Sequence, residues 1–207
     1  RALEDLAMAL PANEDALERL LDACVGLGLL AKNAGHYANT PVAETYLCSA
    51  SPRRLTGYLN FSNEVVWPLW SHLEDAVREG THRWKQAYGW ETPIFANLFH
   101  SDDAKRDFLM GMNGFGVISS PHVVDAFDLS RFQKFVDLGG ATGHLAVAAC
   151  RRYPHLRAVV FDLPDAMPLC REMVGQTPVA DRIEIVAGDF FADPLPPADL
   201  YALSRIL

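Results

Sequence analysis

The chain has 207 residues, of which half are hydrophobic and 21% are charged, a composition typical of a folded globular protein. Its formal net charge of −8 at pH 7 disfavours general nucleic-acid binding and offers no basic face to an anionic membrane. No apolar run approaches the roughly 20 residues needed to cross a bilayer, and the cysteines are scattered, so we expect a cytoplasmic protein with reduced thiols and no metal site.

The first segment has the pattern of helices followed by a hairpin. Apolar side chains recur at helical spacing on one face of the first clear helix: Leu17, Leu20, Leu21, Cys24 and Leu27. An apolar piece at 29–31, a turn at 33–35 and residues 36–39 predict a small hairpin. Thr40 and Pro41 then supply an N-cap and a first-turn proline for another helix. This order is the outline of a winged helix.

A winged helix raises the possibility of DNA binding, which the charges disfavour. The helix before the hairpin carries four acidic side chains against Arg19 alone: Glu14, Asp15, Glu18 and Asp22. Such a helix would repel phosphate groups. We therefore assign residues 1–60 to a dimerisation domain, with no nucleic-acid partner, and read its start at Arg1 as an N-terminal truncation.

Residues 61–130 have a helical pattern and contain all the tryptophans: Trp67, Trp70, Trp84 and Trp90. The simplest interpretation is a helical core in which most of these aromatic side chains are buried. The alternative is a connector that lines an apolar pocket for a flat aromatic substrate. Phe108, Met112 and Phe115, near helical spacing, are the candidate pocket walls, although core packing is favoured for any one of them.

From residue 131 onward the pattern alternates between strands and helices. Strands are expected at 135–138, 158–162, 183–187 and 199–207, and helices at 145–153 and 166–174. This order predicts an α/β fold, a Rossmann-like doubly wound parallel sheet, preceded by the helical winged-helix domain. Ligands of such sheets bind at the carboxyl ends of the strands. Because the last apolar run reaches Leu207, we expect the C-terminal part of the sheet to be missing and the chain to be a fragment.

Three predicted strands each end in an acidic residue: Asp137, Asp162 and Asp189. The first is followed by a glycine turn, Gly139-Gly140-Ala141-Thr142-Gly143, which does not have the G-x-G-x-x-G spacing of dinucleotide sites. A carboxylate beside that turn would repel a pyrophosphate but would favour the ammonium and sulfonium groups of S-adenosylmethionine. Asp189 on its own could be an ordinary turn residue. The three acids together favour S-adenosylmethionine, with an NAD-dependent oxidoreductase as the alternative.

The motifs DLGGATG, FDLPD and GDFFADPLPPADLYALSRIL together resemble the class I S-adenosylmethionine-dependent O-methyltransferases of the caffeate and acetylserotonin type, most closely the acetylserotonin group and its "like" proteins. The likeness covers almost the whole chain, since DAVREGTHRWKQAYG and AFDLSRF match the connecting region of that family. It implies methyl transfer to a hydroxyl of a small aromatic molecule, and a homodimer formed through residues 1–60. Residues 131–207 would be the first half of the cofactor domain.

The resemblance also implies which residues contact the cofactor: Gly139, Asp162, Gly188, Asp189, Phe190, Arg205 and Phe99. Gly139 would lie under the methionine part, Asp162 would take the ribose hydroxyls, and the Gly188 to Phe190 segment would surround the adenine. Arg205 would contact the cofactor and Phe99 would help to cover it. Ala141 stands where the family often has a third glycine, a change that we expect to be tolerated.

The resemblance assigns no catalytic residue within 1–207. The family's general base is a histidine that follows the segment matched by Arg205 to Leu207, and the histidines of this chain stand elsewhere. A further alternative, which the "like" proteins of the family suggest, is a non-catalytic relative that dimerises or binds the cofactor.

Overall fold

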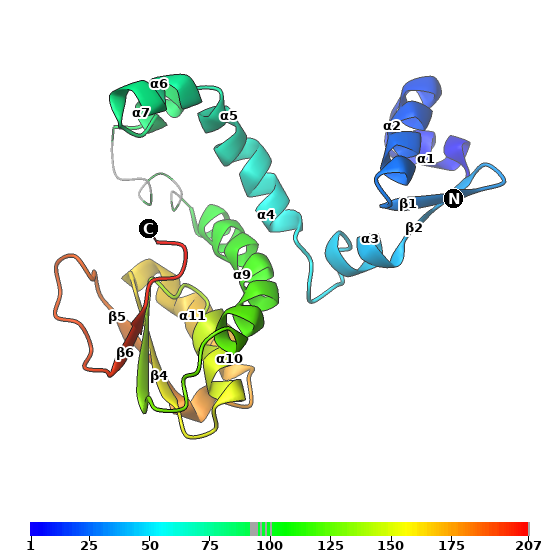
Figure 1. The fold of residues 1–207 in the computed structure, drawn as a ribbon. Helices are drawn as coiled ribbons and strands as arrows, with labels where there is room; N and C mark the ends of the chain where they lie inside the picture. Colours follow the sequence, from blue (N-terminus) through cyan, green and yellow to red (C-terminus); the bar gives the residue numbers. More distant parts are fainter. Residues whose placement is uncertain (92–94, 96, 98, 100, 207) are drawn as a thin grey trace. The chain divides into compact units, whose positions relative to one another are not determined.

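The computed structural model describes residues 1–91, 95, 97, 99 and 101–206. The chain divides into two compact units, Arg1–Thr56 and Gly57–Leu207 (Figure 1). Among the described residues, no helix is both long and apolar enough to span a membrane.

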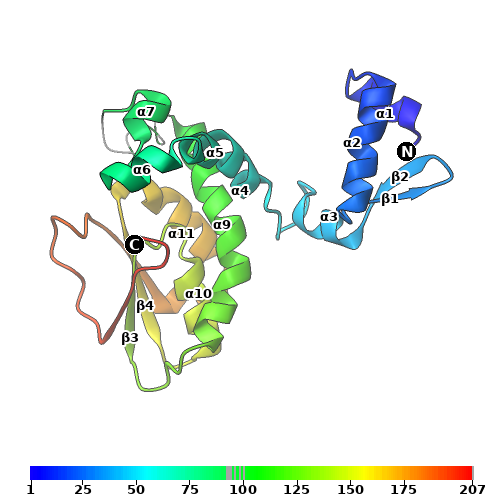
Figure 2. The same ribbon diagram turned by 45° about the horizontal axis from the view of Figure 1, so that its top comes forward.

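The N-terminal unit is a helical domain with a two-stranded hairpin. Its elements are α1 (Leu3–Ala9), α2 (Glu14–Gly26), β1 (Leu30–Asn33), β2 (His36–Asn39) and α3 (Pro41–Tyr46). The strands pair antiparallel around Ala34 and Gly35, whose φ angles of 47° and 76° are those of a type I′ turn. Figure 2 shows α2 beside this hairpin. The predicted helix, hairpin and following helix are all confirmed.

The ends and faces of these helices follow from their side chains. Thr40 accepts a hydrogen bond from the Ala43 N–H at 3.3 Å, and Pro41 occupies the first turn of α3, as expected. On α2, Leu17 is buried, but Leu20 and Leu27 are 62% and 74% exposed. Because the unit is too small to cover the whole apolar face of α2, part of that face stays open to solvent.

The second unit begins with a run of helices: α4 (Thr56–Phe61), the π-helix η1 (Ser62–Val66), α5 (Trp67–Trp70), α6 (Leu73–Glu79), α7 (Trp84–Tyr88) and the long α9 (Asp102–Asp125). The wide turn of η1 is braced by the Tyr88 hydroxyl, which donates to the carbonyls of Glu64 and Val65 at 2.9 and 2.5 Å. Trp67 and Trp70 are 73% and 59% exposed, so the core interpretation is wrong for these two. Both lie on the short α5, where solvent rather than core faces them.

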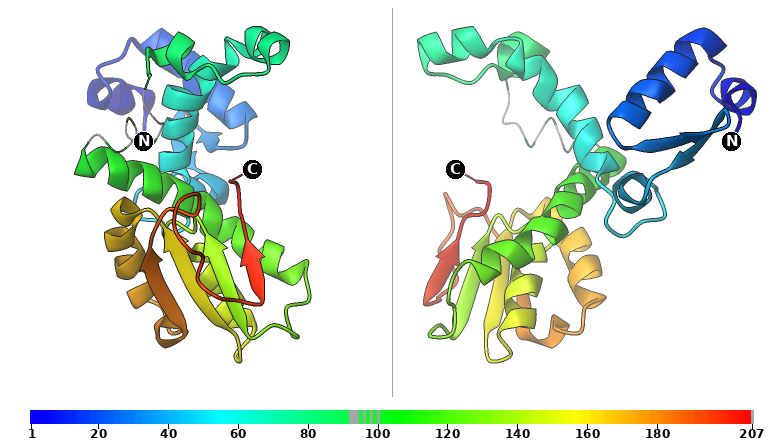
Figure 3. Two further views of the ribbon diagram at one scale, coloured as in Figure 1. Left: turned by 90° about the vertical axis from the view of Figure 1, so that its left-hand side faces the viewer. Right: turned by 45° about the vertical axis from the view of Figure 1, so that its right-hand side comes forward.

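The remaining elements form a parallel sheet in the order β5-β4-β3-β6. The strands are β3 (Lys134–Leu138), β4 (Arg157–Asp162), β5 (Ile183–Ala187) and β6 (Leu200–Ala202), and the connecting helices are α10 (His144–Arg152), η2 (Pro164–Ala166), α11 (Met167–Gly175) and η3 (Ala180–Arg182). Figure 3 shows α9, α10 and α11 on one face of the sheet. The predicted parallel α/β architecture is confirmed.

The two faces of the sheet are buried to different depths. Between the sheet and the helices lies the larger core, which includes Phe135, Val160 and Cys170. On the opposite face a smaller cluster of Val136, Leu138, Val159 and Phe161 is partly covered by Phe190. The strands are therefore apolar on both sides, as expected of a parallel sheet.

The last strand is shorter than predicted. We expected a strand over 199–207, but β6 ends at Ala202. Its pairing with β3 covers only Phe135 to Asp137, and β3 itself ends one residue later, where the glycine turn begins. Arg205 has a φ of +62°, which extended backbone does not adopt. Residues 204 and 205 form a turn.

Candidate functional site

The predicted acidic residues meet at one edge of the sheet. Asp137 is the second-last residue of β3, Asp162 ends β4, and Asp189 comes just after β5. These strands are parallel neighbours in register, with Asp162 opposite Ala187. The carboxyl ends of β3, β4 and β5 therefore bring all three acids to the same edge, where ligands of such sheets bind.

The glycine turn exposes bare backbone at this edge. Gly139 has a φ of +68°, and a Cβ added to it would lie 2.5 Å from Cδ1 of Ile206. A side chain at this position would therefore be strained by the backbone and obstructed by its neighbour. The same added Cβ would lie 3.7 Å from the ring of Phe190, so the structure brings Gly139 and Phe190 together.

Ala141 adopts a conformation that explains why glycine is common there. Its φ is +47°, in the left-handed region, which costs an alanine about 1 kcal/mol. Its N–H donates to Oδ2 of Asp162 at 2.7 Å. The hydrogen bond holds the turn in place despite the strain, consistent with the expected tolerance of alanine.

Asp162 is held rigidly by backbone donors. Oδ2 accepts from Ala141 N–H, and Oδ1 accepts from Leu163 N–H at 2.7 Å. Burial raises the pKa of Asp162, while the two N–H donors oppose that rise. Each carboxylate oxygen can accept a second hydrogen bond. The carboxyl group is thus oriented in advance and keeps acceptor capacity for hydroxyl groups of a ligand.

Asp137 lies beneath the glycine turn and is incompletely paired. Its side chain is 1% exposed, and Oδ2 has no hydrogen-bond partner among the described residues. Burial, followed by repulsion from Asp162, raises the pKa of Asp137 to about 7, although a hydrogen bond from the Ala146 N–H favours the ionised form. A cation that binds nearby would stabilise the ionised form of this carboxylate.

The segment after β5 is a tight turn that places an aromatic ring on the sheet. The Gly188 N–H donates to the carbonyl of Asp162 at 2.9 Å, and a Cβ on Gly188 would lie 2.4 Å from the Phe161 ring. Oδ1 of Asp189 accepts from the Phe191 N–H at 2.9 Å. Asp189 therefore stabilises the turn that positions Phe190, and its place beside an adenine stays a prediction.

The turn after β6 carries Arg205 to the aromatic side chains of the helical segment. The guanidinium carbon lies 4.2 Å from the centroid of the Phe115 ring and 5.4 Å from that of Tyr58. Its neighbour Ile206 lies against Gly139. The structure thus brings the segment of Arg205 to the glycine turn, and stacking on α9 and α4 orients its side chain. Its contact with a cofactor stays a prediction.

Phe99 lies in a cluster of phenylalanine rings rather than against the glycine turn. Its ring centroid is 5.5 Å from that of Phe95 and 5.8 Å from that of Phe108, which also contacts Phe61. No contact with the glycine turn is seen within the described part of the chain. Its role in covering a cofactor stays a prediction.

Sequence reasoning missed a buried polar network behind the glycine turn. Oγ1 of Thr142 donates to Oδ1 of Asn113 at 2.8 Å, and the Ser120 hydroxyl lies 2.8 Å from Nδ1 of His144. The His144 ring fits only because residue 116 is glycine, where an added Cβ would lie 2.2 Å from the ring. The network fastens the turn to α9. In the sequence, only the spacing of small and polar residues along α9 could have indicated this network.

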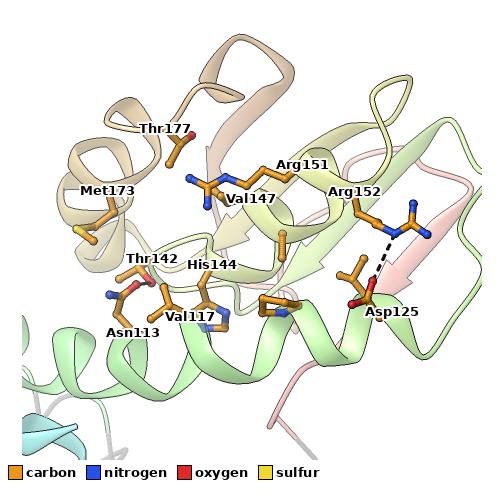
Figure 4. A pocket seen from close by; sticks show the side chains of 13 residues that line it. Asn113, Val117, Asp125, Thr142, His144, Val147, Arg151, Arg152, Met173 and Thr177 are labelled. Atoms are coloured by element: carbon orange, nitrogen blue, oxygen red, sulfur yellow. Dashed lines mark hydrogen bonds and ion pairs between the residues drawn. The ribbon is translucent and has the colours of Figure 1, made fainter. Parts of the chain in front are cut away.

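A groove lies behind this network, between α9, α10 and α11 (Figure 4). It has a volume of about 410 Å³ and includes Asn113, Thr142 and His144 in its lining. The residues that the structure describes contain no group of three or more histidine, cysteine or acidic side chains able to hold a metal ion.

Comparison with protein families identifies both parts of the chain. Residues 1–49 match the O-methyltransferase dimerisation domain, and residues 70–207 match the O-methyltransferase domain.

Among curated proteins, the chain is similar to the human probable bifunctional dTTP/UTP pyrophosphatase/methyltransferase protein, with 40% identity over 98% of the chain and 33% of that protein. It is 37% identical to acetylserotonin O-methyltransferase of Gallus gallus, covering the whole chain and 61% of that enzyme. The chain thus spans between about a third and three fifths of the length of these relatives.

Solved structures show the same similarity. Human N-acetylserotonin methyltransferase in complex with SAM superposes with a TM-score of 0.86 at 32% identity, covering 100% of the chain and 61% of that structure. PigF with SAH gives a TM-score of 0.79 at 26% identity, covering 97% and 60%. The chain belongs to the S-adenosylmethionine-dependent O-methyltransferase family and carries that family's dimerisation domain ahead of its methyltransferase domain.

Proposed function

We propose that the protein is an S-adenosylmethionine-dependent O-methyltransferase that methylates a hydroxyl group of a small aromatic molecule. The observation that carries the proposal is the edge formed by β3, β4 and β5. A bare glycine backbone, an oriented carboxylate and an incompletely paired buried acid meet there. The similarity to human N-acetylserotonin methyltransferase in complex with SAM and to PigF with SAH supports the cofactor.

The residues at this edge fit the chemical groups of S-adenosylmethionine. We infer that the methionine part lies beside the glycine turn at Gly139, where the backbone has a φ of +68°. The buried acid Asp137 supplies negative potential beneath the ammonium and sulfonium groups. Asp162 accepts hydrogen bonds from the ribose hydroxyls, since both of its oxygens keep a free lone pair.

The adenine is proposed to bind beside the turn after β5. Gly188 keeps the backbone close to the sheet, and Asp189 shapes the turn that holds the Phe190 ring near Gly139. A flat ring there can stack on adenine. Arg205 and Phe99 are proposed to close the site from the side of the helical segment.

The bound cofactor would supply an electrophilic methyl group on its sulfonium. The residues of this chain bind and orient that group, and we propose that the helical connector, 61–130, positions the acceptor. Phe108, Met112 and Phe115 lie on one half-buried face of α9. Phe115 also stacks under Arg205, which ties this face to the cofactor edge. We propose no catalytic residue within 1–207.

We further propose a homodimer formed through residues 1–60, with residues 131–207 as the cofactor domain. The N-terminal unit leaves large apolar side chains exposed, among them Met8, Leu20 and Leu27. Exposed apolar surface of this kind is typical of a protein interface. The match of residues 1–49 to the dimerisation domain supports the same proposal.

Calorimetry of the chain with S-adenosylhomocysteine and, separately, with NADH tests the cofactor. We expect binding of S-adenosylhomocysteine only; binding of NADH alone would instead support the oxidoreductase alternative. Transfer of a radiolabelled methyl group to a panel of phenols then tests the reaction. Cofactor binding without transfer to any phenol would favour the non-catalytic relative, provided that the protein tested includes the segment expected to supply the histidine base.

A further inference from the structure

The groove between α9, α10 and α11 has the size and lining of a small-molecule site. Its volume of about 410 Å³ falls within the range of ligand pockets, roughly 300–1,000 Å³. Its walls are largely apolar, with Val117 and Val124 from α9, Val147 from α10 and Met173 from α11. These helices cover one face of the sheet, and the groove opens between them (Figures 3 and 4).

The mouth of the groove carries an uncompensated positive charge. Figure 4 shows Arg151 and Arg152, the last two residues of α10, at the lining. Nε of Arg152 lies 3.4 Å from Oδ1 of Asp125, so these two charges offset one another. Arg151 is exposed and makes no ion pair or hydrogen bond with any residue that the structure describes. Among the described residues that line the groove, Arg151 is thus the unpaired cation, in a chain whose net charge is −8.

The inner end of the groove is polar but carries no negative charge. Asn113 accepts from Thr142 through Oδ1, which leaves its amide NH₂ without a partner among the described residues. Burial, followed by the positive charge of Arg205, lowers the pKa of His144 to about 4, so its ring is neutral at pH 7. The groove therefore offers a donor and a cation around an apolar centre.

We propose that this groove binds a small organic anion with an apolar body, such as an aromatic or aliphatic carboxylate or sulfonate. The body would lie between Val117, Val147 and Met173, and the anionic group would pair with the Arg151 guanidinium. An inorganic ion would leave the apolar walls unfilled, and a neutral apolar molecule would not use Arg151. The groove is a second site, because Gly139 and Asp162 do not line it.

The site also has a physical connection to the glycine turn. Thr142 belongs to that turn, and His144 begins α10 directly after it. Both side chains line the groove and hydrogen-bond to α9 through Asn113 and Ser120. A ligand in the groove would touch the turn from the side away from Gly139.

Calorimetry with naphthalene-2-sulfonate, compared with the neutral naphthalene-2-sulfonamide, tests the proposal. We expect the sulfonate to bind more tightly, and Arg151→Gln to weaken its binding by about tenfold, the loss expected for one charged hydrogen bond. Arg171→Gln is the matched control, because Arg171 is exposed on α11 and does not line the groove. A second variant, Ala148→Phe, places a ring among the lining residues and is expected to reduce binding of both probes.

Three results would overturn the proposal. The first is equal affinity of the two probes, or equal loss of affinity in the Arg151 and Arg171 variants. The second is displacement of the sulfonate by S-adenosylhomocysteine, which would place the probe in the cofactor site. The third is a change of sedimentation coefficient in Arg151→Gln with unchanged probe binding, which would make the groove a surface between copies of the chain.

Discussion

Acidic side chains of the N-terminal unit and of the carboxyl edge of the sheet differ in their hydrogen-bond partners and in the direction of their pKa shifts. In the N-terminal unit, Asp22 lies 2.8 Å from Nζ of Lys32 and accepts from the Tyr37 hydroxyl at 2.7 Å. These hydrogen bonds lower the pKa of Asp22. At the sheet edge, burial raises the pKa of both Asp137 and Asp162, and one oxygen of Asp137 has no partner within the described part of the chain.

The difference shows which of the two acidic regions contributes to stability and which to binding. The charge of a paired acid at the surface is already stabilised by its hydrogen-bond partners and by water. A buried acid without a cation makes folding less favourable and is retained where a ligand or reaction needs it. The sheet edge is therefore the place where a charged ligand would change the protein most.

The largest expected effect follows from removing the oriented carboxylate of the sheet edge. Asp162→Ala removes the acceptor for Ala141 N–H and Leu163 N–H and the proposed partner of the ribose. We expect the affinity for S-adenosylhomocysteine, measured by calorimetry, to fall by about 100-fold, as for the loss of two charged hydrogen bonds.

A nearby acid provides the control for this change. Asp165 lies three residues further on, in η2, but is exposed and pairs with Lys105 at 2.7 Å. Asp165→Asn is expected to leave the affinity nearly unchanged. Equal losses in the two variants would mean that cofactor binding responds to any change of charge near the end of β4, and would contradict a specific role of Asp162.

Much of this sheet edge could be predicted because it depends on local sequence. One strand carries Asp137 at its second-last position, the next ends in Asp162, and Asp189 comes two residues after a third; the helices between these strands define a parallel order. Parallel order alone places strand ends at one edge. The glycine turn could also be predicted, because Gly139 and Gly143 have the positive φ angles that glycine permits.

Features that depend on tertiary packing could not be predicted. The turn at Arg205 replaces the end of an expected strand, because the glycine turn of β3 ends the pairing. The exposure of Trp67 depends on which side of a short helix faces the core. The groove requires three helices from distant parts of the sequence, so no local pattern around Arg151 indicates it.

Alanine substitutions at two glycines with similar φ angles distinguish backbone strain from steric contact of the added Cβ. Gly35 has a φ of +76° with nothing within 4 Å of an added Cβ, whereas Gly139 has a φ of +68° and would contact Ile206 at 2.5 Å. Gly35→Ala is expected to destabilise its unit by about 1 kcal/mol through backbone strain. Gly139→Ala should cost about 2 kcal/mol, since a contact must also shift, and should weaken cofactor binding. Urea unfolding measures the free energy of unfolding of both variants. Equal losses of stability would show that the Ile206 side chain can move away from the added Cβ at no cost.

The buried acid of the sheet edge predicts a dependence of stability on pH. Because the folded pKa of Asp137 is raised from 3.8 to about 7, its contribution to stability is fully present below pH 4 and is lost as pH rises through 7. Asp137→Asn removes this loss, so we expect the variant to be about 1–2 kcal/mol more stable than the parent at pH 8, and closer to it at pH 5.

The same substitution should weaken the binding of a cationic cofactor. Asp162 and Cys170 also face Asp137, but burial raises the pKa of the Cys170 thiol to about 12, so it stays neutral throughout. Urea titrations at both pH values, with calorimetry alongside, measure the two effects. A variant that is less stable at pH 8 would show that the Asp137 carboxylate already has a compensating partner.

The smallest effect is expected where the acids are already paired. Lys32→Met removes the ammonium group that lies 3.0 Å from Glu18 and 2.8 Å from Asp22. Because these side chains are exposed and solvent screens them, the melting temperature should fall by no more than a few degrees.

The folded pKa of Asp22 lies below 3.8, so its contribution to stability is present above that pH and is lost as pH falls further. The deficit of Lys32→Met should therefore be visible at pH 6 and shrink at pH 3, opposite in direction to the effect of Asp137→Asn. Thermal melts at the two pH values measure it, and a deficit that grows on acidification would mean that Lys32 stabilises the unit through packing on Tyr37 rather than through its charge.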